Sequence, residues 1–251
     1  MNFRRLAAPI IGLTIFSLFW EIVVRVFDVP RFALRPPSGI VSTIAEDPSF
    51  YLTNALVTGR HVTIGLVLSL AVALVIGAVM ASSQLIEEAV QPVLILILVT
   101  PWVAYVTSVV IWLDFGEAPI VFMVAFTAFP VFTFGVVGGM KSADAAAREL
   151  FASVDAGRWD VFWRLRLPSA LPSIFTTIRL ALGLGLAAAY FSEGAALSND
   201  GLGAIGKRAT AFNDGDTLWA TVISTAILGL VGLALTSIAE RVLLRWHASQ
   251  R

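Results

Sequence analysis

The feature that most constrains this chain is a series of long apolar segments that recur along its whole length. Each segment has close to the ~20 residues that an α-helix needs to cross a bilayer, and charged or turn-forming residues flank it. Only 14% of the residues are charged, against about a quarter in a typical soluble domain. We therefore predict an all-α, polytopic membrane protein that forms a single transmembrane domain over residues 1–251. The expected spans, about six, are Leu6–Phe27, Leu56–Ala81, Pro92–Leu113, Pro119–Met140, Pro172–Gly194 and Thr217–Glu240.

The prolines refine the ends of these spans. Three of them are expected at helix starts, where the missing N–H costs nothing: Pro92, Pro119 and Pro172. Pro101 and Pro130 fall inside spans, so they should kink or break them. At the N-terminus, Arg4 and Arg5 precede an apolar run as in a secretory signal. Because that run lacks a clear small-residue cleavage site, we expect it to remain as the first span.

The distribution of lysine and arginine predicts the orientation in the membrane. If the N-terminus is cytoplasmic, eleven basic residues fall on the inside and six on the outside, as the positive-inside rule requires. The inside set is Arg4, Arg5, Lys141, Arg148, Arg158, Arg164, Arg166, Arg179, Arg241, Arg245 and Arg251. The outside set is Arg25, Arg31, Arg35, Arg60, Lys207 and Arg208. An even number of spans then returns the C-terminus to the cytoplasm.

Two outside segments are long enough to have structure. In Asp28–Ala55, a turn at residues 36–39 precedes a short amphipathic pattern and indicates a capped helix. Ser198–Asp216 is rich in glycine, asparagine and aspartate, which predicts a loop. It includes Gly201-Leu202-Gly203-Ala204-Ile205-Gly206-Lys207-Arg208, close to a phosphate-binding loop. The residue after the lysine is arginine instead of serine or threonine, and no strand precedes it, so we expect no nucleotide there.

Composition excludes several other classes of function. The chain has no cysteine and only two histidines, His61 and His247, so disulfides, thiol chemistry and a histidine-rich metal site are excluded. A net charge of zero gives no indication of nucleic acid as a partner. An intramembrane enzyme would need clustered catalytic groups, and the expected spans hold neither a His/Asp pair nor paired aspartates.

The inside segment Lys141–Leu171 differs sharply from the spans around it. Charged residues return, and large aromatic residues lie among them in a stretch that can form one or two short helices. Aromatic residues and arginine dominate the energetic centres of protein interfaces, so this pattern predicts a docking surface. A juxtamembrane helix with tryptophans in the headgroup region would give the same pattern.

Residues 149–168 resemble the "EAA" loop of ABC importer permeases. The family pattern is Glu-Ala-Ala, three residues, Gly, nine residues, an aliphatic residue, any residue and Leu-Pro. Glu149, Leu165, Leu167 and Pro168 match it, and Arg158, Trp159 and Phe162 are typical of the family. The sequence departs at Leu150 and Phe151, where the family usually has alanine, and at Asp155, where it has the glycine of a tight turn. Aspartate tolerates a left-handed conformation, and Ala156-Gly157 offers a nearby substitute.

Further residues extend the resemblance, to the taurine/sulfonate/nitrate branch, over nearly the whole chain. They are Trp20-Glu21, Pro36-Pro37-Ser38, Phe129-Pro130, Glu193 and Gly201-Leu202-Gly203. The resemblance implies a type I ABC importer permease fold in the bacterial inner membrane and a dimer, expected to be a homodimer. The loop of about 141–171 would dock as a coupling helix on each of two cytoplasmic ATPase subunits. Its contact residues would be Glu149, Phe151, Asp155, Arg158, Trp159, Phe162, Leu165, Leu167 and Pro168.

The resemblance also implies that an extracytoplasmic binding protein delivers the substrate and that ATP and Mg²⁺ bind to the partner ATPase, with no cofactor in this chain. The expected cargo is a small organic anion or related solute: a sulfonate, nitrate, bicarbonate, or an aromatic or pyrimidine precursor. An ion-gradient-driven secondary transporter and a non-transporting scaffold are the alternatives. Inverted repeats with paired broken helices would indicate the secondary transporter.

A few polar and aromatic residues inside spans are candidates for the transport pathway. Glu193 lies deep in a late span, where a charge usually faces the bundle interior or water. We expect it to line or gate the pathway, with an arginine as a candidate partner; a structural ion pair is the alternative. His61 is expected to be a packing or interfacial residue. Trp102, Tyr105, Thr107 and Ser108 could line the pathway in the third span, or serve as packing and interfacial residues.

Overall fold

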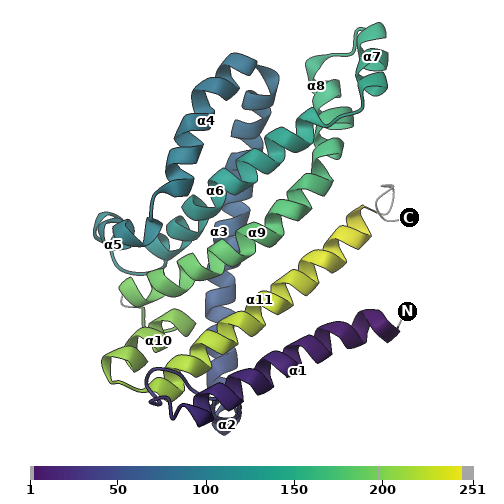
Figure 1. The fold of residues 1–251 in the computed structure, drawn as a ribbon. Coiled ribbons are helices and arrows are strands. Elements are labelled where there is room, and N and C mark those ends of the chain that lie inside the picture. Colours follow the sequence, from purple (N-terminus) through teal and green to yellow (C-terminus); the bar gives the residue numbers. More distant parts are fainter. Residues whose placement is uncertain (1–2, 197, 245–251) are drawn as a thin grey trace.

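The computed structural model describes residues 3–196 and 198–244, which form helices and no strand (Figure 1). In chain order the helices are α1 (Phe3–Val26), α2 (Pro37–Glu46), α3 (Pro48–Ser82), α4 (Gln84–Val99), the 3₁₀ helix η1 (Trp102–Tyr105), α5 (Val106–Leu113), α6 (Glu117–Lys141), α7 (Ala145–Ser153), α8 (Arg158–Val161), the π-helical turn η2 (Phe162–Arg166), α9 (Leu167–Ala195), α10 (Leu202–Ala211) and α11 (Gly215–Leu243). The all-helical prediction is confirmed.

Within residues 3–196 and 198–244, four helical stretches are long and apolar enough to cross a membrane. They are Pro48–Ser82, Glu117–Lys141, the continuous stretch Arg158–Ala195, and Gly215–Leu243. A fifth exists if α4 and η1–α5 count as one broken span, bent by 81°. The first expected span coincides with α1, whose 24 residues have the length that crossing requires. Four to five of the six expected spans are therefore supported by length and composition, and α1 is a further helix of spanning length.

Several expected boundaries are wrong, and the errors concern prolines and glycines. Pro92 and Pro172 lie inside α4 and α9, because the residues before each proline already belong to the helix. Pro130 leaves α6 continuous, whereas Pro101 lies at the break between α4 and η1, as expected. The segment Ser198–Asp216, expected to be a loop, contains the helix α10.

Helices α3, α6 and α9 pack most closely, through residues without large side chains. On α3, a Cβ at Gly65 would come 2.5 Å from Val124, so the glycine lets α6 approach. On α6, the Gly135–Gly139 pair faces α9, where a Cβ at Gly139 would come 2.7 Å from the backbone of Ala170. Small residues at such crossings allow close helix contact in membranes. The glycine pair of α6 therefore has an internal packing role.

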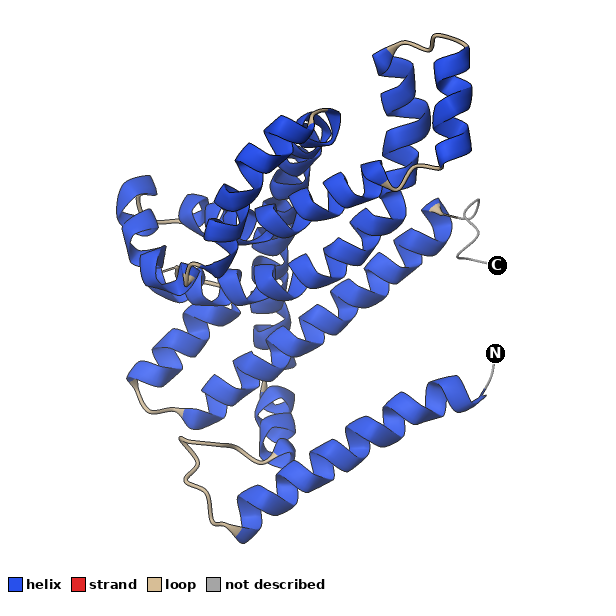
Figure 2. Ribbon diagram, turned by 45° about the horizontal axis from the view of Figure 1, so that its top comes forward, coloured by secondary structure: helices blue, strands red, loops and turns tan. Residues whose placement is uncertain are grey.

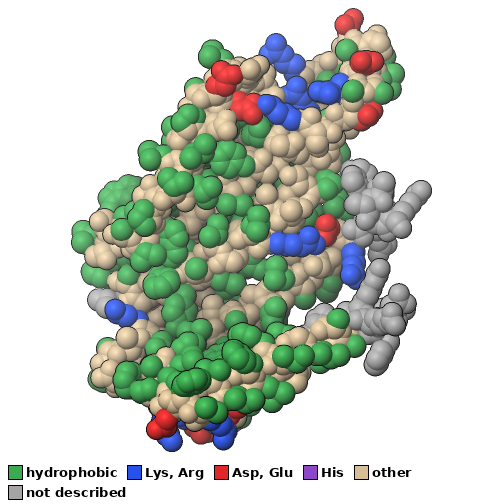
Figure 3. Space-filling model, in the orientation of Figure 1, with side chains coloured by type: hydrophobic (Ala, Val, Ile, Leu, Met, Phe, Trp, Pro, Cys, Tyr) green, Lys and Arg blue, Asp and Glu red, His purple; other side chains and the backbone are tan. Residues whose placement is uncertain are grey.

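The molecule has two distinct ends. The hairpin of α7 and α8, the start of α1 and the end of α11 lie toward one end, and α2, α5 and α10 lie toward the other (Figures 1 and 2). Charged side chains gather mostly at these ends, and hydrophobic side chains cover much of the surface between them (Figure 3). Arg245, Arg251 and His247, and the side chains of Arg4 and Arg5, lie outside the described part of the chain.

Candidate functional site

The hairpin of α7 and α8 projects beyond the packed spans, at the end where α6 finishes and α9 begins (Figure 2). Asp144 begins it as the N-cap of α7, accepting a hydrogen bond from the Ala147 N–H at 3.0 Å. After the short helix α8 the chain runs through η2 straight into α9. A displacement of α8 would therefore act directly on a spanning helix.

Asp155 forms the turn between α7 and α8. Its φ of 45° lies in the left-handed region, and the Ala156 N–H donates to the Phe151 carbonyl at 3.0 Å. Gly157 has an ordinary φ of −60°, so it does not supply the turn. The left-handed conformation expected at Asp155 is thus present, although the residue is not glycine.

Three aromatic rings cluster along α8 and η2. Trp159 stacks on Phe162 with ring centroids 5.8 Å apart, and Trp163 meets Phe162 edge-on at 5.2 Å. Trp159 nevertheless keeps 72% of its surface exposed, and Leu150 on α7 keeps 63%. The cluster is ordered by its own ring contacts and still presents a large apolar surface to its surroundings.

The expected coupling residues occupy different levels of this hairpin. Exposed at its surface are Glu149, Asp155, Arg158 and Trp159. Half-buried or buried are Phe151, beside the turn, and Phe162, Leu165, Leu167 and Pro168, where the hairpin joins α9. Among the described residues neither Glu149 nor Arg158 forms an ion pair, whereas Asp160 and Arg164 pair with each other at 3.3 Å. Glu149 and Arg158 are therefore available to charges on another molecule.

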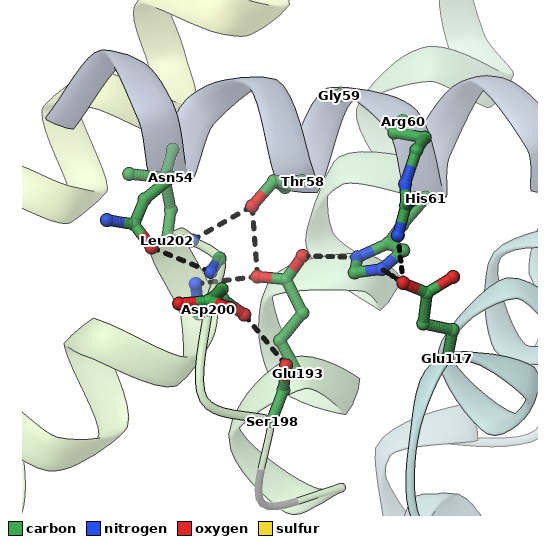
Figure 4. A network of polar contacts seen from close by, with 12 residues as sticks. Asn54, Thr58, Gly59, Arg60, His61, Glu117, Glu193, Ser198, Asp200 and Leu202 are labelled. Carbon is green, nitrogen blue, oxygen red and sulfur yellow. Dashed lines mark hydrogen bonds and ion pairs between the residues drawn. The ribbon is translucent and has the colours of Figure 1, made fainter. Parts of the chain in front are cut away.

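At the opposite end of the molecule, Glu193 of α9 is completely buried (Figure 4). Its Oε2 accepts hydrogen bonds from Thr58 Oγ1 at 3.0 Å and from the Gly203 N–H at 2.8 Å. Its Oε1 lies 2.9 Å from Nδ1 of His61, which is 1% exposed. The expected arginine partner is wrong: the partner of this carboxylate is a histidine on α3.

Helix α3 supplies a row of polar side chains to this network. Asn54, Thr58 and His61 follow one another at spacings of four and three, so they lie on one face of the helix. The Leu202 N–H donates to Thr58 Oγ1 at 2.9 Å, and the Gly201 N–H donates to Asn54 Oδ1 at 2.8 Å. The row therefore binds the first N–H groups of α10, which helix geometry leaves without partners.

The glycines at the start of α10 are required by this close contact. Gly201 has φ +106°, and a Cβ there would come 2.6 Å from the Glu193 carboxylate. A Cβ at Gly203 would collide with the backbone carbonyl of Tyr190, and one at Gly206 with the Tyr190 hydroxyl. The N–H groups of Gly201, Leu202 and Gly203 are already bound to side chains, so they are not available to cradle a phosphate.

The second ring nitrogen of His61, Nε2, faces the start of α6. It has no hydrogen-bond partner among the described residues and lies 4.0 Å from Glu117 Oε1. Glu117 in turn pairs with Arg60 (Figure 4). The result is a chain of ionisable groups that runs from the exposed Glu117 to the buried Glu193.

A cavity of about 380 Å³ lies between η1–α5, α9, α10 and α11, and Trp102, Tyr105 and Ser108 are not among the residues that line it. Thr107 lines it. Trp102 and Tyr105 are half-buried and pack edge-on against Phe191 and Phe126, while Ser108 is exposed on α5. Whether these residues contact a transported solute stays a prediction.

Asn54 and Thr58 were not predicted to belong to a site, and His61 was predicted only as a packing or interfacial residue. The signal was present as three polar residues at helical spacing in an otherwise apolar span, where unpaired polar groups are costly. Their partner, however, is more than 130 residues away in the chain, and local patterns contain no information on such a contact.

Comparison with known proteins adds to this picture. Residues 69–246 match the family described as "Binding-protein-dependent transport system inner membrane component". Over 243 residues the chain is 29% identical to the formylaminopyrimidine transport permease protein ThiX of Halalkalibacterium halodurans, covering 96% of both chains. It is 26% identical to the taurine transport system permease protein TauC of Escherichia coli, covering 92% of this chain and 86% of that one. The aliphatic sulfonates permease protein SsuC of Bacillus subtilis, whose assignment is itself putative by name, is also 26% identical, over 92% and 84%.

Proposed function

This chain belongs to the family of binding-protein-dependent transport system inner membrane components, and we propose that it is the permease subunit of an ATP-driven importer. In this role its spans form the substrate pathway, and a separate ATPase subunit drives their rearrangement. The chain itself has no ATPase activity and holds no cofactor, while ATP and Mg²⁺ bind to the partner. Family membership favours this function over a secondary transporter or a scaffold.

The observation that carries the proposal is the exposed hairpin of α7 and α8. Trp159 and Leu150 present apolar surface, and Glu149 and Arg158 present unpaired charges, all on a projection that no other described element covers. Burial of apolar surface on a partner is worth ~25 cal/mol per Å², so such a surface supports docking. A groove on the ATPase would cover the rings and pair the charges.

The proposal extends to the assembly. Two copies of this chain and two ATPase subunits would form the transporter, with an extracytoplasmic binding protein on the opposite face. The hairpin would then lie in the cytoplasm together with both termini, which agrees with the excess of basic residues assigned to that side. The cytoplasmic membrane of a bacterium is the matching location.

The substrate is proposed to be a small organic solute of the kind the relatives are named for, such as a sulfonate or a pyrimidine precursor. Glu193 is proposed to gate the substrate pathway by holding α9, α3 and the start of α10 in position. Its carboxylate ties α9 to α3 and to the start of α10, so a change in these bonds would alter the outer end of the pathway.

The test is co-purification of the tagged full-length chain with its ATPase from native membranes in mild detergent. Trp159→Ala should abolish recovery of the ATPase, because it removes the largest exposed ring of the hairpin. Trp112→Ala is the matched control: Trp112 is also 72% exposed, but it lies on α5 at the other end of the molecule. A Glu149→Gln, Arg158→Gln double variant should weaken recovery.

Two results would contradict the docking role of the hairpin. The first is equal loss of the ATPase in Trp159→Ala and Trp112→Ala, with both variants folded. The second is a wild-type chain that reproducibly purifies folded and alone.

A further inference from the structure

The cavity beside α10 lies at the end of the molecule opposite the hairpin of α7 and α8. Helices from four separate parts of the sequence line it, and its volume of about 380 Å³ falls within the ~300–1,000 Å³ typical of small-ligand sites. Val103 and Phe191 of its lining are about half exposed, at 49% and 54%, so a solute can enter without unfolding any helix. The chemistry of its walls indicates what it would bind.

Lys207 is the one basic residue among the described residues that line the cavity. Its aliphatic stem crosses α9 where Gly194 has no side chain: a Cβ at Gly194 would come 2.9 Å from Lys207 Cβ. No described carboxylate pairs with the Lys207 ammonium group, which is exposed. The stem is thus held in place while the charge remains available to an anion.

The rest of the wall combines apolar surface with hydroxyl groups. Val103 and Phe191 supply aliphatic and aromatic surface, and Thr107 places a hydroxyl without a hydrogen-bond partner in the described chain at the same cavity. The Tyr190 hydroxyl, 2.9 Å from Thr221 Oγ1, keeps further hydrogen-bonding capacity. These groups suit a solute with one polar end and an apolar body.

No acidic residue lines this cavity within the described chain. Glu193 of α9 is buried, but its carboxylate points away from the cavity, toward α3. Its two oxygens are bound to Thr58, His61 and Gly203. Its negative charge is also offset by the positive N-terminal end of α10. The electrostatic balance of the cavity is therefore positive, which favours anions over cations.

We propose that this cavity is an outer substrate subsite and that it selects small organic monoanions with an apolar body through Lys207. The inference rests on the proposed transport function and adds the place where the solute binds and the residue that recognises its charge. The anionic end would meet Lys207 and the Thr107 hydroxyl, and the apolar body would lie against Phe191 and Val103.

The experiment uses the full-length chain in phosphatidylcholine nanodiscs and ¹⁹F NMR line broadening to measure binding. The probe is 4-fluorobenzenesulfonate, and 4-fluoro-N,N,N-trimethylanilinium serves as the cation of similar shape. Lys207→Met is compared with Arg208→Met, which removes a neighbouring exposed cation that does not line the cavity but contacts the Asn199 carbonyl.

We expect the wild-type chain to bind the anion at least about fivefold more tightly than the cation, the effect of one partly exposed charge. Lys207→Met should weaken anion binding by a similar factor, and Arg208→Met by less than about twofold. Absence of anion binding to the wild type, equal binding of anion and cation, or equal effects of the two substitutions would each overturn the proposal.

Recovery of the ATPase, measured on the same preparations, separates this inference from the proposed function. If the ATPase is recovered and the anion does not bind, the substrate subsite alone is refuted. If the anion binds through Lys207 and no ATPase is recovered, the importer function fails and the binding site stands.

Discussion

Replacing Glu193 offers the sharpest test of how the end of this molecule opposite the hairpin of α7 and α8 is held together. The carboxylate accepts hydrogen bonds from two elements other than its own helix, α3 and the start of α10. Glu193→Ala would remove the acceptor and leave its partners buried. Thr58 can turn its hydroxyl to a carbonyl of its own helix, but the Gly203 N–H and His61 Nδ1 have no such alternative.

The size of the effect follows from these two stranded groups. Each buried polar group left without a partner costs about 1–3 kcal/mol, so the expected loss of stability is about 2–6 kcal/mol. Glu193→Gln should cost only about 1 kcal/mol. Its amide oxygen can accept from Thr58 and Gly203, and its NH₂ can donate to His61 Nδ1 if the imidazole proton moves to Nε2.

The assay is thermal unfolding in detergent, followed by the fluorescence of the seven tryptophans. At about 2–4 °C per kcal/mol for a chain of this size, Glu193→Ala should lower Tm by roughly 10 °C and Glu193→Gln by a few degrees. Glu117→Ala is the control: it removes an acid that is 59% exposed and paired with Arg60, so its effect should stay below about 1 kcal/mol.

The reasoning would be refuted if Glu193→Ala melted with the wild type, or if Glu193→Gln were as damaging as alanine. The first result would mean that water or a rearranged α10 satisfies the stranded donors. The second would mean that the negative charge itself, and not the set of acceptors, maintains the contact between α9 and α10.

Three further perturbations test other parts of the structure. Gly203→Ala should cost about 3 kcal/mol or more in thermal unfolding, because its Cβ collides with a backbone carbonyl of α9, whereas Gly183→Ala meets nothing within 4 Å and should be neutral or stabilising. Asp155→Gly should raise Tm slightly by relieving up to about 1 kcal/mol of left-handed strain; an unchanged or lower Tm would contradict this. The hydrogen bond from the Thr217 side chain, then that from its N–H, lowers the pKa of Asp214, which caps α11. Its stabilising effect should be present above the unfolded pKa and disappear as the pH falls through the folded pKa; Asp214→Asn should lack this acid-dependent step in Tm, and an identical pH profile would refute the assignment.

The sequence contained enough to predict the helices and the hairpin. In a bilayer every backbone polar group must be satisfied within the chain, so long apolar segments become helices whatever their neighbours are. The turn at Asp155 was equally local, because a left-handed conformation is a property of one residue and its immediate neighbours. The mixture of aromatic and charged residues in 141–171 is a local pattern too, and it predicted one or two short helices, which are α7 and α8.

The sequence by itself thus determined the class of fold, the positions of most spans and the position of the hairpin of α7 and α8. Tertiary structure alone decided that Pro101 breaks a helix while Pro130 does not, that α10 folds against α9, and that Glu193 meets His61. The reason is that helix formation in an apolar segment is governed by local backbone hydrogen bonds. The partners of a buried carboxylate, in contrast, depend on which side chains three-dimensional packing brings within about 3 Å of it.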